Sequence, residues 1–282
     1  MNKKSQIEKA KDFLSLHQSR ELLIIPNIWN PIGARILEAK GYSAVATASA
    51  AVSSSLGYKD GERIKFSTLM DVLTRVASSV EIPVSADIES GYADSISSLK
   101  ENINQIIASG VVGINIEDSL KEEGVLRPIE DQCKRITAVR ETAEEHNIHL
   151  VINARVDCFL SGTFQTNEEK IEETVIRAKL YSEAGADCIY PIGPGDKETV
   201  QTLRNRIASP INILASVNAV PLTVMKELGI NRVSFGPYIF RSCLKKFIDI
   251  VDELYGLGNY DCFTDNMMSR DETKEFLIQE PE

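Results

Sequence analysis

Short apolar runs alternate with amphipathic stretches along almost the whole chain of 282 residues. Eight runs rich in β-branched residues predict strands at 22–25, 44–46, 84–86, 112–116, 150–154, 188–191, 211–215 and 232–235. The stretches between them carry apolar residues at three- and four-residue spacing, which predicts helices at 32–40, 67–79, 95–109, 130–145, 168–183, 197–207 and 222–228. Further helices are expected at 5–17 and 240–254. This alternation is typical of βαβ units with parallel strands.

The number of strands favours an α/β fold of the closed (β/α)8 TIM-barrel type. Gly41, Gly110, Gly185 and Gly229 lie just past predicted helix ends, where glycine commonly stops a helix. An open, doubly wound sheet is the alternative, and it predicts a glycine-rich phosphate turn after the first strand. The sequence at 25–31 reads IPNIWNP, without a G-x-G-x-x-G pattern. The barrel is therefore the preferred fold.

Composition narrows the class of protein. We expect one domain over residues 1–282, with the barrel at about 20–245 and a C-terminal helix and tail at about 240–282, because 43 % apolar residues can fill one large core. A formal charge of -10 and a pI near 5.0 argue against nucleic-acid and membrane partners. Five cysteines without C-x-x-C spacing, and no continuous apolar segment near the N-terminus, predict a cytoplasmic protein.

Acidic residues end the third and fourth predicted strands. Asp87 and Glu89 are two residues apart on an extended segment, and Glu117 ends the neighbouring strand. Parallel barrels keep their active sites at this end, so the three carboxylates are expected to converge there, where they would repel one another without a cation. The three histidines fall in or beside helices, which leaves oxygen ligands and favours Mg2+, or alternatively Mn2+. The competing interpretation is solvated acids at loop starts.

Other residues at the same predicted rim suit anion binding. Arg155 follows the fifth strand and could bind a carboxylate or phosphonate through its planar fork, or could instead pair with Glu117 or Asp157 for structure alone. The small-residue turn at 46–51 exposes backbone N–H groups that suit an oxyanion. The polar segment at 52–62 is typical either of a mobile lid that carries a charge to the site or of a plain surface loop.

Several of these segments together resemble the isocitrate lyase and phosphoenolpyruvate mutase superfamily. The resemblance rests on WNP at 29–31, AR at 34–35, ASA at 48–50, KD at 59–60, ADIESGY at 86–92, IED at 116–118 and ARVD at 154–157. It implies a (β/α)8 barrel whose eighth helix is exchanged between the subunits of a homo-oligomer, a dimer or a dimer of dimers. It also implies a small 2-oxo or 2-hydroxy acid as ligand and a Mg2+ site at Asp87, Glu89 and Glu117.

The resemblance assigns further roles residue by residue. It implies that Arg155 binds the substrate carboxylate, that the backbone N–H groups of Ser49 and Ala50 stabilise the enolate oxygen, and that Asp60 is the acid of a gating loop. Trp29 and Asp87 are then expected to contact the substrate as well. Arg155, Asp60 and Ser49 form the expected catalytic set.

Two departures from the superfamily narrow the reaction. The loop at 119–128 lacks the Lys-[KR]-Cys-Gly-His segment of isocitrate and methylisocitrate lyases, and the segment at 191–194 lacks the histidine typical of the mutases. We therefore expect a lyase that cleaves a bond beside the carbonyl of a small 2-oxo acid through a pyruvate enolate, with oxaloacetate as the simplest substrate. Phosphonopyruvate hydrolase or mutase-type carbon-phosphorus chemistry is one alternative, and a non-catalytic metabolite-binding barrel is another.

Overall fold

Strands and helices alternate in a computed structural model that describes residues 4–120, 124–256, 258, 260–264 and 267–277. The strands are β1 (Leu23–Ile25), β2 (Asn27–Ile28), β3 (Val45–Thr47), β4 (Val84–Asp87), β5 (Gly113–Glu117), β6 (Val151–Val156), β7 (Cys188–Pro191), β8 (Asn212–Leu214) and β9 (Arg232–Ser234). The helices are α1 (Gln6–Gln18), α2 (Pro31–Ala39), α3 (Ser49–Ser55), α4 (Phe66–Ser78), α5 (Ile96–Ala108), α6 (Ile129–Glu145), α7 (Asn167–Glu183), α8 (Lys197–Arg206), α9 (Leu222–Glu227), α10 (Tyr238–Tyr255), α11 (Asp261–Thr264) and α12 (Arg270–Glu275). The predicted (β/α)8 barrel is confirmed.

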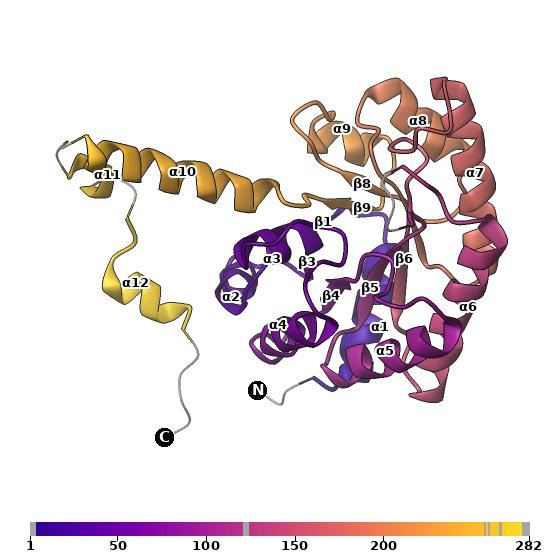
Figure 1. Cartoon of the computed structure of the whole chain (residues 1–282), viewed down its shortest axis with the longest axis horizontal. Helices are drawn as coiled ribbons and strands as arrows, with labels where there is room; N and C mark the ends of the chain where they lie inside the picture. The colour runs from indigo at the N-terminus through magenta and orange to yellow at the C-terminus, as the bar shows by residue number, and fades with distance from the viewer. Residues whose placement is uncertain (1–3, 121–123, 257, 259, 265–266, 278–282) are drawn as a thin grey trace.

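All strand pairs are parallel and the strands close into a barrel. One sheet has the order β2-β3-β4-β5-β6-β7 and the other the order β1-β9-β8. A parallel bridge between Ile189 and Ile211 joins β7 to β8. At the other seam, β1 and β2 are two parts of one strand interrupted at Pro26, which has no N–H to donate to a neighbour. Helices α2 to α9 lie around this barrel (Figure 1).

Helix α1 closes the N-terminal end of the barrel. The Phe13 ring lies so close to Gly113 at the start of β5 that a Cβ atom at Gly113 would come within 2.5 Å of it. On the opposite side, His17 Nε2 lies 3.3 Å from Nη1 of Arg232 at the start of β9. Both Phe13 and His17 are fully buried. Ligands must therefore enter from the C-terminal ends of the strands.

The interior of the barrel is unusually polar. Barrel cores are commonly filled by Val, Ile and Leu. Here, a cavity of about 260 Å3 is lined by interior polar side chains that include Ser85, Asn115, Asn153, Asn212 and Arg232. Since Asp87 ends β4 and Arg232 begins β9, this cavity reaches from the C-terminal ends of the strands toward the floor of the barrel.

Helix α10 extends away from the barrel, and α11 and α12 follow it (Figure 1). Phe240 near its start is buried, but most of its apolar side chains are exposed, namely Leu244, Phe247, Ile248, Val251, Leu254 and Tyr255. The chain then returns to α2, where Arg35 Nε donates a hydrogen bond of 2.7 Å to the carbonyl oxygen of Phe276. The exchange of this helix between subunits stays a prediction. Across the described helices, none combines the length and apolar character that crossing a bilayer requires.

Most predicted elements agree with the structure to within one or two residues. The exceptions lie near the mouth of the barrel and in the tail. The turn expected at 46–51 and the first part of the polar segment at 52–62 form helix α3, so only residues 56–65 form the loop that bears Asp60. The short helices α11 and α12 were not predicted.

Candidate active site

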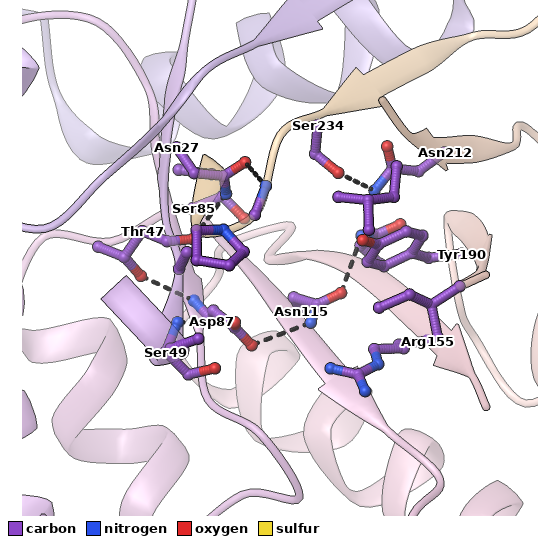
Figure 2. A pocket seen from close by; sticks show the side chains of 18 of the residues that line it. Asn27, Thr47, Ser49, Ser85, Asp87, Asn115, Arg155, Tyr190, Asn212 and Ser234 are labelled. Carbon is purple, nitrogen blue, oxygen red and sulfur yellow. Dashed lines mark hydrogen bonds between the residues drawn. The ribbon is translucent and has the colours of Figure 1, made fainter. Parts of the chain in front are cut away.

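The cavity at the C-terminal ends of the strands gathers most of the residues singled out from the sequence. Ser49, Ala50, Asp60, Asp87 and Arg155 all line it. Figure 2 shows Ser49, Asp87, Asn115, Arg155 and Tyr190 around this space. These residues come from different strands, from the start of α3 and from the loop after α3, as expected for a barrel active site.

Asp87 is held on several sides. The backbone N–H of Ser49 donates to its Oδ2 at 2.8 Å, and Nδ2 of Asn115 donates to its Oδ1 at 3.0 Å. The backbone N–H of Asp87 itself donates to Oγ1 of Thr47 on the adjacent strand β3. These bonds fix the orientation of the carboxylate. The Ser49 N–H group, which was predicted to stabilise the enolate oxygen, thus donates to Asp87 instead.

Asp60 reaches the same cavity from the loop at 56–65. Burial raises the pKa of the Asp60 carboxyl, and the nearby Asp87 carboxylate raises it further. The Ser49 hydroxyl donates a hydrogen bond to Asp60 and acts in the opposite direction, as does Arg155. Ser49 therefore links both acids, one through its backbone and one through its side chain.

Glu89 lies in a neighbouring cavity of about 260 Å3. Its Oε1 accepts from the Tyr92 hydroxyl at 2.8 Å and its Oε2 from the Glu62 backbone N–H at 2.6 Å. The Glu62 carboxylate in turn accepts from Ser90 Oγ at 2.6 Å and from the Tyr92 N–H at 2.7 Å. Glu62, Glu89 and Tyr92 all have positive φ near 54°, a conformation that side chains other than glycine rarely adopt. The loop that carries Asp60 is thus clamped onto the segment after β4.

Arg155 forms ion pairs with two acids at once. Its Nε and Nη2 donate to Asp157 at 2.6 and 2.8 Å, and its Nη1 lies 2.7 Å from Glu117 Oε2. The alternative pairing considered from the sequence therefore occurs, with both candidate partners. Arg155 also lines the main cavity. Its guanidinium has five N–H groups, and the three contacts leave the others free to bind a ligand. Its other face lines the neighbouring cavity together with Glu89 and Glu117.

Asp118 supports the site from behind. It is fully buried, and its carboxylate accepts from the Asp157 backbone N–H, Arg177 and the Tyr181 hydroxyl at 2.8 to 2.9 Å. These contacts anchor the segment that carries Arg155 and Asp157. Asp118 therefore has a structural role here.

The acids around the two cavities disfavour one another's charge. Burial raises the pKa of Glu89 to about 7, and the charges of Asp60 and Asp87 contribute. Burial also raises the pKa of Glu117 well above its ordinary value, although Arg155 opposes this shift. An arrangement in which carboxylates raise one another's pKa would be relieved by a cation.

The three predicted metal ligands are divided between the two cavities. Asp87 lines the main cavity, whereas Glu89 and Glu117 line the neighbouring one. Within the part of the chain that the structure describes, no group of three His, Cys, Asp or Glu side chains is arranged to hold a metal ion. Of these three acids, Asp87 is the one that lines the main cavity.

Trp29 packs against the start of α10, and its substrate contact stays a prediction. Its ring packs edge-on against Phe240 of α10, with 5.0 Å between the ring centroids. Among the described residues it belongs to the lining of neither cavity. It instead joins the start of α10 to Ala48 and Ala51.

Sequence reasoning missed the polar residues inside the barrel. Asn115 and Asn153 occupy the middle of β5 and β6, where neutral amides carry no strong sequence signal. Their alternation with apolar neighbours, as in GINIE and VINAR, was the available clue, because alternate residues of a strand share one face. Glu62 was missed because it lies in a loop whose contacts no periodicity describes.

Comparisons with known proteins agree with this fold. The model of the phosphoenolpyruvate phosphomutase family matches residues 13–255. An uncharacterised protein of Mycobacterium tuberculosis is 32 % identical over 228 residues, which cover 80 % of this chain and 83 % of the relative. The 2-methylisocitrate lyase of Aeropyrum pernix is 27 % identical over 275 residues, 93 % of this chain and 85 % of that enzyme. The oxaloacetate decarboxylase of a Marinomonas strain is 25 % identical over 283 residues, 96 % and 94 % of the two chains.

Solved structures are similar over nearly the whole chain. A candidate lyase or mutase from Burkholderia cenocepacia superposes with a TM-score of 0.88 at 27 % identity, covering 97 % of each chain. A phosphonopyruvate hydrolase in complex with oxalate and Mg2+ superposes with a TM-score of 0.83 at 21 % identity, covering 95 % of this chain and 94 % of the other. At that identity the second similarity concerns the fold alone.

Proposed function

Because the chain belongs to the phosphoenolpyruvate phosphomutase family, we propose that it is a Mg2+-dependent lyase that cleaves a bond beside the carbonyl of a small 2-oxo acid. The observation that carries this proposal is the convergence of Asp60, Asp87 and Arg155 on one cavity at the C-terminal ends of the strands. Acids and a guanidinium at this place suit a metal ion and an anionic substrate, respectively.

The donor set fits Mg2+. The side chains around the main cavity offer oxygen atoms from Asp60, Asp87 and Ser49, and Mg2+ prefers such ligands and usually takes only one or two carboxylates directly. We assign direct ligation to Asp87, with Glu89 and Glu117 holding water molecules from the neighbouring cavity. When bound, the ion would act as a Lewis acid toward the carbonyl oxygen of the substrate.

The chain's own residues bind and orient the substrate. Arg155 presents the unused part of its guanidinium to the substrate carboxylate, while Glu117 and Asp157 keep it rigid. Ala50 at the N-terminal start of α3 offers its backbone N–H to the enolate oxygen, and Ser49 keeps Asp87 and Asp60 in place. Asp60 lies on the loop at 56–65, which Glu62 holds against the segment after β4. In this closed position the loop would exclude water from the developing enolate.

Oxaloacetate is the first substrate to test, because oxaloacetate decarboxylases are among the relatives at 25 to 27 % identity. Carbon-phosphorus chemistry is the second candidate. It is supported by the phosphoenolpyruvate phosphomutase of Tetrahymena pyriformis, which is 24 % identical over 266 residues. A cavity of about 260 Å3 suits a small acid of either kind. A barrel that binds a metabolite without turnover would not need to retain these acids and Arg155.

We further propose that a second copy of the chain covers α10. Its exposed apolar side chains recur at three- and four-residue spacing from Leu244 to Tyr255 and form one face, defined by the six exposed residues named above. A helix of 18 residues with an uncovered apolar face is expected to pack against another protein surface. The exchange of this helix between subunits, as the superfamily resemblance implies, would bury that face.

The function is tested by a substrate panel. Purified protein is incubated with Mg2+ and oxaloacetate, phosphonopyruvate or 2-methylisocitrate, and pyruvate release is followed with and without a chelator. We expect chelator-sensitive pyruvate release from oxaloacetate or phosphonopyruvate. Release from 2-methylisocitrate would contradict the argument from the missing cysteine segment, and release that the chelator leaves unchanged would contradict the metal assignment.

A further inference from the structure

A hydrogen-bonded chain of side chains crosses three adjacent strands inside the barrel. Nδ2 of Asn115 donates to Oδ1 of Asp87 at 3.0 Å, and Nδ2 of Asn153 donates to Oδ1 of Asn115 at 3.0 Å. The strand register places the three residues next to each other, with Asp87 opposite Asn115 and Asn115 opposite Asn153. Figure 2 shows the first of these contacts.

The chemistry of these three side chains fixes which group donates and which accepts in each hydrogen bond. An ionised carboxylate can only accept hydrogen bonds, so Asn115 must turn its NH2 group toward Asp87. Its Oδ1 then faces β6, where it requires a donor, and Asn153 supplies its NH2 group. The Oδ1 of Asn153 consequently remains without a hydrogen-bond partner, although Asn153 is fully buried. Turning the Asn153 amide over would not give its Oδ1 a hydrogen-bond donor, because this oxygen would then face the Oδ1 of Asn115.

This arrangement is costly for stability. An unpaired buried acceptor lowers stability, and an apolar side chain in the same place would avoid that loss. Asn153 is therefore poorly explained by packing alone. The structure offers another reason, since the bond that Asn153 donates to Asn115 Oδ1 holds the Asn115 amide in place against Asp87.

We propose that Asn153 is a positioning residue that acts through Asn115 to hold the Asp87 carboxylate in the orientation required for Mg2+. The inference rests on the proposed function, because it takes Asp87 as the metal ligand. The Ser49 N–H at 2.8 Å holds Oδ2, whereas Oδ1 accepts from the Asn115 amide at 3.0 Å and from the Glu89 backbone N–H at 3.4 Å, so Oδ2 keeps a lone pair for the cavity. Removing the amide on β6 frees Asn115 to rotate and leaves Oδ1 of Asp87 with only the longer contact to the Glu89 backbone N–H. Residues that orient a metal ligand typically contribute 10- to 100-fold to metal affinity or activity.

The first test compares Asn153→Leu with the wild-type chain. Leucine has a similar size, and the substitution removes the unpaired Asn153 acceptor while leaving Asn115 Oδ1 without its donor, so we expect little change in the unfolding midpoint. We expect the affinity for Mg2+, measured by titration calorimetry, to fall 10- to 100-fold. Asn153→Ala tests the same prediction if the leucine variant does not fold. Thr174→Val is the matched control, because it also makes a buried polar position apolar but lies on α7 behind the barrel wall.

The second test does not depend on the metal. A crystal structure of Asn153→Leu at atomic resolution should show the Asn115 side chain rotated away from Asp87 or split between conformers. If Asn115 keeps its single conformer and its 3.0 Å contact with Asp87, the inference is wrong, whatever the metal affinity. If the wild-type chain binds no Mg2+, the proposed function fails, and the conformation of Asn115 in the variant still decides whether Asn153 holds it against Asp87.

Discussion

Asp60 and Arg155 each line both of the cavities at the mouth of the barrel, so together they separate the space that holds Asp87 from the space that holds Glu89 and Glu117. Arg155 lowers the pKa of Asp60, whereas burial and Asp87 raise it. Arg155 is fixed on the barrel by two ion pairs, but Asp60 belongs to a loop. A movement of that loop would therefore join the two cavities.

Replacing Asp87 should abolish activity without unfolding the protein. We expect Asp87→Ala to lower kcat by about 1000-fold or more, which corresponds to about 4 kcal/mol of lost transition-state stabilisation. The unfolding midpoint, followed by circular dichroism, should change little. Asp71→Ala is the control, since Asp71 is 63 % exposed and pairs with Arg75 on the surface of α4. Unchanged turnover in Asp87→Ala would remove the metal assignment.

Arg155 should be required for both stability and substrate binding. In Arg155→Met the buried Glu117 and Asp157 lose their cationic partner, and we expect the free energy of unfolding to fall by about 3–5 kcal/mol. Arg155→Lys keeps the charge but loses the planar fork, so we expect a smaller loss of stability and a rise in KM of about 10- to 100-fold. Urea unfolding and steady-state kinetics separate the two effects. Equal kinetics for lysine and arginine would argue against a bidentate substrate contact.

Asp60 should matter for catalysis and not for stability. Asp60→Asn keeps a group that can accept from Ser49 but removes a carboxylate whose pKa Asp87 raises, so we expect an unchanged or slightly higher unfolding midpoint. We expect kcat to fall about 100-fold or more, the lower end of what a positioned acid or base contributes. Lys59→Gln, the neighbouring loop position, is the control. A drop in stability with full activity would show that Asp60 is a structural residue.

His17 should make folding less favourable in acid. Burial lowers the pKa of His17 to about 4, from an ordinary value of 6.5, and Arg232 contributes. The unfolded chain therefore binds a proton between pH 6.5 and 4 that the folded chain does not, so the contribution of His17 to stability is present above pH 6.5 and is lost as the pH falls toward 4. The expected loss is on the order of 3 kcal/mol. Urea unfolding of the wild-type chain and His17→Asn at pH 7 and 4.5 measures it, and identical pH slopes would exclude the effect.

The exposed face of α10 should control assembly. Light scattering after gel filtration is expected to give a mass that is a multiple of 31.2 kDa for the wild-type chain. Phe247, 64 % exposed at the centre of this face, is the residue to change. We expect Phe247→Glu to shift the protein toward the monomer, because it places a charge in an apolar contact, while Lys246→Glu should not. A wild-type monomer would contradict the proposed subunit contact.

The barrel and its acidic mouth could be predicted from the sequence because strand period and strand ends are local properties. Asp87, Glu89 and Glu117 each follow an apolar run, and parallel strands bring such ends to one side. The division of these acids between two cavities could not be predicted, because it depends on where the Asp60 loop and Arg155 lie.

The contacts of individual side chains are the part that local patterns do not encode. Asn115 and Asn153 are 38 residues apart and meet only through the register of β5 and β6. Trp29 was assigned to the substrate by resemblance, yet its neighbour Phe240 comes from the other end of the barrel sequence. Pairings of this kind depend on tertiary structure and not on propensity.

The most direct test of the proposed chemistry is a crystal structure of the protein with Mg2+ and oxalate, a compact mimic of the pyruvate enolate. We expect the ion in the main cavity with an Asp87 oxygen at about 2.1 Å, the distance usual for Mg2+, and the oxalate within reach of Arg155. An ion found away from Asp87, or oxalate bound outside this cavity, would contradict the account.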